Sequence, residues 1–315
     1  MVASFLPRAR SLCKVSRDGV GMDTSLYRRL RRGLTLVLVV AGAITFGPTA
    51  GAGPTATAPS VVTGHVLIYG PSLADVAGFN ERAAARSLGY TVAVADTIAW
   101  KALTRADFAR YDAIIIGDRG CTAPNRRYLR VAAATRGKWT AAITGNVAIV
   151  GTDPAYHAQE GVTGARQLVV NGLKYAAESP TTGAYLSLGC AYSTAARFTP
   201  VRLLRGFGPF TVRGQDTFSA RGCPDKVEIV KPRNPLVTDL TNQDLSEWGC
   251  SIHEGVDSYP YPFTVTAVHR PTSMPYLLTR RPTSAGASDS VTRFSAPASG
   301  IPSRQGEAVA PNAGD

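Results

Sequence analysis

Short apolar runs alternate with amphipathic segments along most of this chain of 315 residues. Five of the runs are continuous, and glycine, proline or polar residues follow them. Continuous apolar runs of this length are typical of strands that are buried on both faces of a parallel sheet. The predicted strands occupy residues 65–69, 91–95, 113–116, 146–150 and 183–188.

The segments between these strands have the spacing of helices. Residues 74–88, 126–142 and 161–178 repeat apolar positions at helical intervals, and a shorter helix begins at Thr104. Strands that alternate with helices form a parallel sheet covered on both faces. The pattern therefore predicts an α/β fold with a doubly wound, mostly parallel sheet.

The alternation weakens after residue 189. The later part of the chain predicts short helices at residues 200–206 and 241–248 and strands at 210–212, 226–230 and 264–269.

Composition divides the chain further. Residues 61–270 are long enough for one domain with a full core, and residues 53–60 form a Pro/Thr/Ala linker before it. Residues 271–315 are rich in Pro, Ser, Ala, Gly and Thr, with almost no large apolar residue after Leu278. Such a segment buries too little apolar surface to order itself, so we predict a disordered tail there.

The start of the chain has the pattern of a secretory leader. Four arginines between residues 28 and 32 precede an uncharged apolar run at 33–46, and a small-residue cleavage pattern ends at Ala52. The run is shorter than the roughly 20 residues that span a bilayer. We predict a signal peptide over residues 1–52, with Met22 as a second possible start, and a secreted mature chain without a membrane span. A retained membrane anchor is the alternative.

Removing this leader changes the charge. The net charge of the whole chain is +12, but 26 Lys/Arg against 20 Asp/Glu remain after residue 52, a net charge of +6. Most of the remaining cations are spread singly, and Arg126, Arg127 and Arg130 form a tight group. We therefore expect no nucleic-acid partner.

Four cysteines remain after the leader: Cys121, Cys190, Cys223 and Cys250. In an oxidising compartment they predict two disulfides, for which three pairings exist. We favour Cys121 with Cys190 and Cys223 with Cys250. None of them has the C-x-x-C spacing of a zinc site. Our main interpretation includes no metal and no cofactor.

Ligands of open α/β sheets bind beyond the carboxyl ends of the strands. Polar residues gather in the loops there, and Asp118, Thr152, His157 and Tyr192 are the candidate ligand-binding residues.

The loop after residue 150 also carries candidate chemistry. Asp153 and His157 are four residues apart and could form an acid/base pair or part of a metal site. The alternative is that Asp153 caps a turn before Pro154 and His157 hydrogen-bonds to backbone.

Three motifs follow one another in the order of a known family. They are DAIIIGDRG at residues 112–120, NVAIVGTDPAYH at 146–157 and SIHE at 251–254. This order resembles the class I glutamine amidotransferase-like group within the flavodoxin-like folds. The resemblance covers the predicted domain and implies a flavodoxin-like sheet with its site at the strand ends.

The resemblance also implies roles for single residues. It places Gly117 and Asp118 at the turn that supplies oxyanion-hole amides, Asp153 at the nucleophile position, and His253 with Glu254 as the late His–Glu pair. A carboxylate attacks amides far less readily than a thiolate, so we expect no glutaminase activity. The chain looks closer to the secreted, nucleophile-free branches, such as trehalose-utilisation-type domains.

Cys190 is an alternative nucleophile, because it follows the strand at residues 183–188 as an elbow would. A disulfide is the competing interpretation of the same residue.

These observations leave three functional hypotheses. The first is an exported domain that binds a ligand, such as a cell-surface glycan, at the strand ends without amidotransferase chemistry. The second is a secreted hydrolase in which Asp153, His157, His253 and Glu254 perform acid/base work or bind a metal, which requires His253 to lie within about 8 Å of Asp153. The third is a structural module of a surface protein.

Overall fold

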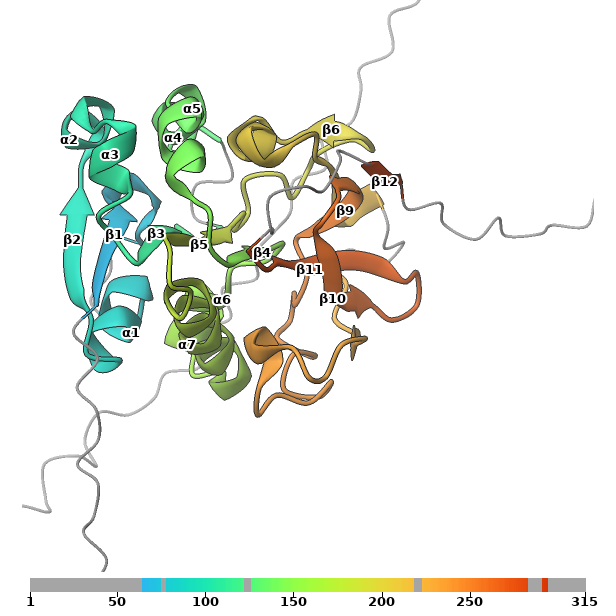
Figure 1. Cartoon of the computed structure of the whole chain (residues 1–315). Coiled ribbons are helices and arrows are strands. Elements are labelled where there is room, and N and C mark those ends of the chain that lie inside the picture. The colour runs from blue at the N-terminus through green and yellow to red at the C-terminus, as the bar shows by residue number, and fades with distance from the viewer. Residues whose placement is uncertain (1–63, 75–77, 122–125, 218–222, 283–290, 294–315) are drawn as a thin grey trace, which may run out of the picture. The chain divides into compact units, whose positions relative to one another are not determined.

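The fold is known from a computed structural model, which describes residues 64–74, 78–121, 126–217, 223–282 and 291–293 (Figure 1). The predicted leader, the linker and most of the predicted tail lie outside these residues.

Five parallel strands form one side of an eight-stranded sheet, from its edge strand inward. They are β1 (His65–Tyr69), β2 (Thr91–Ala95), β3 (Ala113–Ile116), β4 (Val147–Val150) and β5 (Gly183–Ser187). Their spatial order is β2-β1-β3-β5-β4, and all their pairings are parallel. The predicted α/β fold with a parallel core is therefore confirmed. The order differs from the 2-1-3-4-5 order of flavodoxin, since β5 lies between β3 and β4.

Three antiparallel strands extend this sheet beyond β4: β11 (Met274–Arg280), β10 (Thr264–His269) and β8 (Val227–Ile229). Strand β11 lies within the region predicted as a tail from residue 271, so the ordered domain extends at least to Arg280. Its Leu277 and Leu278 are fully buried. Proline within an apolar run argues against a strand. Strand β11 contains Pro275, and the segment around it is rich in Pro, Ser and Thr, so the sequence pattern did not predict it.

A second, antiparallel sheet has the order β12-β9-β7-β6. Its strands are β6 (Thr199–Pro200), β7 (Thr211–Gly214), β9 (Glu254–Pro260) and β12 (Val291–Arg293). A buried ion pair between Arg213 and Asp257 joins β7 to β9. Strand β9 is absent from the sequence prediction, although it carries one end of the candidate site.

Helices cover both faces of the large sheet (Figure 1). One face carries α1 (Glu81–Ser87), α6 (Pro154–Gln159) and α7 (Thr163–Ala177), and the other carries α2 (Thr97–Ala102), α3 (Arg105–Phe108), α4 (Arg130–Ala134) and α5 (Arg136–Trp139). Short 3₁₀ turns occur at η2 (Gly70–Ser72), η3 (Thr140–Ala142), η4 (Arg202–Phe207), η5 (Gln215–Thr217) and η6 (Pro235–Val237).

Several helices are shorter than their apolar spacing predicts. Helix α1 begins only at Glu81, because the Asn80 side chain accepts a hydrogen bond from the Ala83 amide and fixes the N-terminus there. The predicted helix over 126–142 is divided into α4, α5 and η3, and the one at 241–248 consists of turns.

The two faces of the sheet contact two separate apolar clusters, as the period of two in a strand requires. Ile114 and Ile116 of β3 pack with Trp139 on one side, whereas Ile115 packs with Leu168 of α7 on the other. The sheet is thus buried on both faces, which holds the carboxyl ends of β3, β4 and β5 in fixed positions.

Replacement of Gly172 by alanine tests the packing of α7 on β5. A Cβ atom at Gly172 would overlap the Tyr185 ring, so we expect Gly172→Ala to lower the free energy of unfolding by about 1–3 kcal/mol in a urea titration. Gly137 lies in α5 with open space around its Cβ position, so Gly137→Ala should leave stability unchanged or raise it by up to about 1 kcal/mol. Equal effects of the two substitutions would contradict this packing.

Candidate functional site

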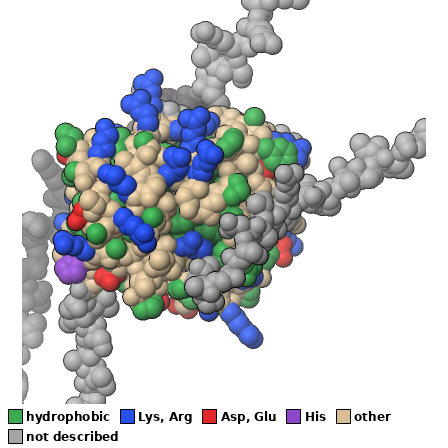
Figure 2. Space-filling view, turned by 45° about the horizontal axis from the view of Figure 1, so that its top comes forward, with side chains coloured by type: hydrophobic (Ala, Val, Ile, Leu, Met, Phe, Trp, Pro, Cys, Tyr) green, Lys and Arg blue, Asp and Glu red, His purple; other side chains and the backbone are tan. Residues whose placement is uncertain are grey.

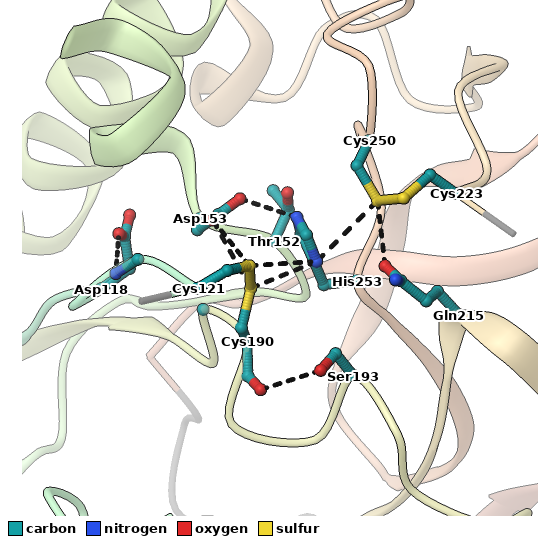
Figure 3. The surroundings of a disulfide bond; sticks show 12 residues. Asp118, Cys121, Thr152, Asp153, Cys190, Ser193, Gln215, Cys223, Cys250 and His253 are labelled. Carbon is teal, nitrogen blue, oxygen red and sulfur yellow. Dashed lines mark hydrogen bonds and ion pairs between the residues drawn. A yellow bond between two sulfur atoms is a disulfide. The ribbon is translucent and has the colours of Figure 1, made fainter. Parts of the chain in front are cut away.

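The candidate site lies where the carboxyl ends of β3, β4 and β5 meet the start of β9 (Figure 3). The backbone amides of His253 and Glu254 both donate to the Gly151 carbonyl, each at 3.0 Å. A Cβ atom at Gly151 would overlap the Glu254 carbonyl, so glycine is required for this approach. The turn after β4 therefore holds the late His–Glu pair in place.

Asp153 lies between two imidazoles. Its Oδ1 is 2.8 Å from Nε2 of His253 and 3.2 Å from Nε2 of His157. All three side chains are buried. Asp153 occupies the N-cap position of α6 without a side-chain capping bond, whereas His157 Nε2 also lies 3.1 Å from the Cys250 carbonyl. The three residues converge, as the hydrolase hypothesis requires. Of the alternative interpretation, the contact of His157 with a backbone carbonyl is found, whereas a capping bond from the Asp153 side chain is not.

Sulfur atoms surround the other side of the His253 ring (Figure 3). Its Nδ1 is 3.3 Å from Sγ of Cys190 and 3.7 Å from Sγ of Cys121. These two cysteines form a disulfide between the loops after β3 and β5. Oδ2 of Asp153 is 3.3 Å from Sγ of Cys121 and 3.5 Å from Sγ of Cys190.

The second disulfide joins Cys223 to Cys250, whose Sγ is 3.9 Å from Nδ1 of His253. Both disulfides have the pairing that the sequence favoured. Two disulfides indicate an oxidising compartment. No helix among the described residues is long and apolar enough to cross a membrane.

Buried carboxyls hold the loops around this cluster. Oδ2 of Asp118 accepts from the Ala155 amide at 2.7 Å, and Oε1 of Glu81 accepts from the Asp118 amide at 2.8 Å. Oε1 of Glu254 accepts from the Tyr192 amide at 2.9 Å. The carboxyls of Asp118 and Glu254, predicted as ligand-binding and catalytic, thus bond to backbone amides.

Thr152, another predicted ligand-binding residue, is fully buried, and its carbonyl accepts from the Ser187 hydroxyl at 2.7 Å. Tyr192 is also mostly buried, although its ring lines a cavity described below.

The pKa values of these carboxyls are shifted in different directions. Burial raises the pKa of Asp118 well above its usual range, and Glu81 and Asp153 act in the same direction. Burial, and to a smaller extent Asp153, raises the pKa of Glu254 well above its usual range. Burial also acts to raise the pKa of Asp153, but His157 and His253 outweigh it and hold that pKa below its usual value. Among these three carboxyls, Asp153 is therefore the one whose surroundings favour the charged form.

A cavity of about 480 Å³ lies on the α4 side of the strand ends. Five arginines line it together with the ring of Tyr192: Arg126, Arg127, Arg130, Arg136 and Arg202. The Arg126 guanidinium lies 4.6 Å from the centre of the Tyr192 ring. Figure 2 turns the α2–α5 side toward the viewer and shows many Lys and Arg side chains on this face, with few acidic ones. No Asp or Glu lines the cavity among the described residues.

No family model, curated protein or solved structure matches this chain. The structure itself supports an α/β domain with a mixed, mostly parallel sheet.

Two residues of this region have no signal in the sequence. Glu81 lies in a segment that the sequence predicts as an ordinary helix, 37 residues before the Asp118 amide from which it accepts. Arg202 lies in the short helix predicted at residues 200–206. Their surroundings depend on contacts distant in sequence.

Glu81 predicts a pH dependence of stability. Burial raises its pKa from 4.5 to about 7, so the folded state retains the proton more strongly than the unfolded chain. The stability from this group is fully present below about pH 4.5 and is lost as the pH rises through about 7. When the pH rises from about 5 to about 8, we expect the free energy of unfolding of the wild type to fall by about 1–3 kcal/mol more than that of Glu81→Gln, as measured by urea titration. Glutamine keeps an acceptor for the Asp118 amide, so parallel pH curves for the two proteins would contradict the raised pKa.

Proposed function

We propose that this chain is an exported domain that binds an acidic cell-surface glycan in the arginine-lined cavity. The observation that carries the proposal is the set of five arginines around one cavity that no Asp or Glu lines among the residues that the structure describes. Export is supported by the leader pattern and by the two disulfides.

The charge of the cavity favours an anionic ligand. Like charges that line one cavity repel one another, and a carboxylate relieves that repulsion while accepting paired guanidinium hydrogen bonds. The size of about 480 Å³ lies within the range of small-molecule sites. The Tyr192 ring adds an apolar surface of the kind found in such sites.

The buried cluster behind the cavity fixes its wall. The Tyr192 amide donates to Glu254, and the neighbouring Cys190 is held by the disulfide to Cys121. A wall fixed before binding lowers the entropy cost of binding. The choice of a glycan as the ligand class comes from the resemblance to amidotransferase-like domains. That resemblance places Asp153 at the nucleophile position, which agrees with a site that does not hydrolyse glutamine.

Removing two exposed arginines tests this function. We expect Arg126→Ala combined with Arg202→Ala to weaken binding of an oligogalacturonide at least about tenfold in isothermal titration calorimetry, because each lost guanidinium removes a charge-assisted hydrogen bond. A neutral malto-oligosaccharide of the same length should not bind the wild type.

The matched control is a second basic cavity of about 630 Å³, which Lys231, Arg233 and Arg281 line. Arg233→Ala with Arg281→Ala removes the same charge and should leave oligogalacturonide binding unchanged. If both double variants weakened binding equally, net charge and not the proposed cavity would carry the affinity.

Hydrolysis is a second candidate function, supported by the convergence of Asp153, His157 and His253. In this alternative, His253 exchanges a proton with the substrate and Asp153 orients the ring. On a panel of p-nitrophenyl esters and glycosides, His253→Gln should lower turnover by at least about a hundredfold. The exposed His65 provides the control substitution His65→Gln, and equal turnover in both variants would exclude this candidate.

A further inference from the structure

Four side chains with metal-binding atoms meet in the buried cluster. Sγ of Cys121, Sγ of Cys190, Nδ1 of His253 and a carboxylate oxygen of Asp153 all lie within 4.8 Å of one another. The four residues come from the loops after β3, β4 and β5 and from the start of β9 (Figure 3). Two thiolates, one imidazole and one carboxylate form a donor set that suits Zn²⁺.

The distances between these atoms match the edges of a coordination tetrahedron. Bonds of about 2.3 Å to sulfur and about 2.0–2.1 Å to nitrogen or oxygen place a sulfur about 3.5 Å from a nitrogen or oxygen ligand. The sulfur to His253 Nδ1 distances are 3.3 and 3.7 Å. The sulfur to Asp153 Oδ2 distances are 3.3 and 3.5 Å. Four of the six edges therefore have the required length before any movement.

We propose that the Cys121–Cys190 pair is a redox gate for a Zn²⁺ site formed with Asp153 and His253. A dithiol reductant transfers two electrons and two protons to the disulfide, which breaks the S–S bond and leaves two thiols, while the reductant becomes a disulfide itself. Zn²⁺ then displaces the two thiol protons. The two sulfurs separate to about 3.8 Å, which completes the tetrahedron.

One contact within the donor set and one contact from outside it orient the ligands. Nε2 of His253, on the side of the ring away from the sulfurs, lies 2.8 Å from Oδ1 of Asp153, so the ring is oriented with Nδ1 toward the sulfurs. His157 lies 3.2 Å from the same oxygen and leaves Oδ2 to face the sulfurs. Cys121 is the least buried of the four ligands and marks the path of entry for the ion.

The second disulfide offers a comparison within the same chain. Cys250 lies 3.9 Å from Nδ1 of His253 and 2.9 Å from the Gln215 side-chain oxygen, and its partner Cys223 belongs to no group of candidate ligands among the described residues. Reduction of this pair should create no site. Substitution of both Cys223 and Cys250 therefore controls for unspecific binding of the metal ion to free thiols.

Cobalt binding to the full-length chain tests the proposal. Co²⁺ takes the place of Zn²⁺ and reports tetrahedral thiolate ligands by intense absorption. After reduction with a phosphine, we expect one Co²⁺ per chain with a thiolate-to-cobalt charge-transfer band, and none in the oxidised chain. Cys223→Ser with Cys250→Ser should keep the band, whereas Cys121→Ser with Cys190→Ser should lose it. Asp153→Asn should weaken Zn²⁺ competition at least about tenfold.

Two outcomes would overturn the proposal. One is cobalt binding without the charge-transfer band, or with a band that also survives in Cys121→Ser with Cys190→Ser. The other is a reduced wild type whose melting temperature does not rise with Zn²⁺, including a chain that fails to fold, because a ligand bound by four segments of the native state must stabilise that state. The arginine variants of the glycan test should leave cobalt binding unchanged, so the two proposals fail independently.

Discussion

The site depends on one close backbone approach, in which the Gly151 carbonyl accepts from the amides of both His253 and Glu254. This contact joins the turn after β4 to the first residue of β9, although about a hundred positions separate them in the sequence. It places His253 against Asp153 and Glu254 under the loop that carries Tyr192. Both the buried cluster and the wall of the arginine cavity follow from it.

The carboxyls around this contact differ because their burial and the charged groups near them differ. Asp118 and Glu254 are fully buried, and burial raises the pKa of both carboxyls, although the backbone amides that they accept from act in the opposite direction. Asp153 keeps its charge because two imidazoles face it. The Asp153 carboxylate thus lies beside a disulfide, and the arginine cavity lies next to this cluster.

The five parallel strands match their predicted bounds to within one residue, because a strand buried on both faces needs an unbroken apolar run. Strands β9 and β11 were not predicted from the sequence, for two different reasons. Polar and charged residues such as Glu254 and Asp257 interrupt β9, and their partners Tyr192 and Arg213 lie in other segments. Pro275 lies within β11 and bulges its pairing with β10.

The sequence by itself determined the alternating strands and helices, the four cysteines after residue 52 and the presence of a carboxylate at position 153, where the amidotransferase-like resemblance places a nucleophile. These follow from local periodicity and residue chemistry. Only the tertiary structure decided that Cys121 faces Cys190 across 69 residues, that His253 touches Asp153, and that scattered arginines share one cavity. The physical reason is that loops at the ends of a parallel sheet meet according to strand order, which spacing along the chain does not encode.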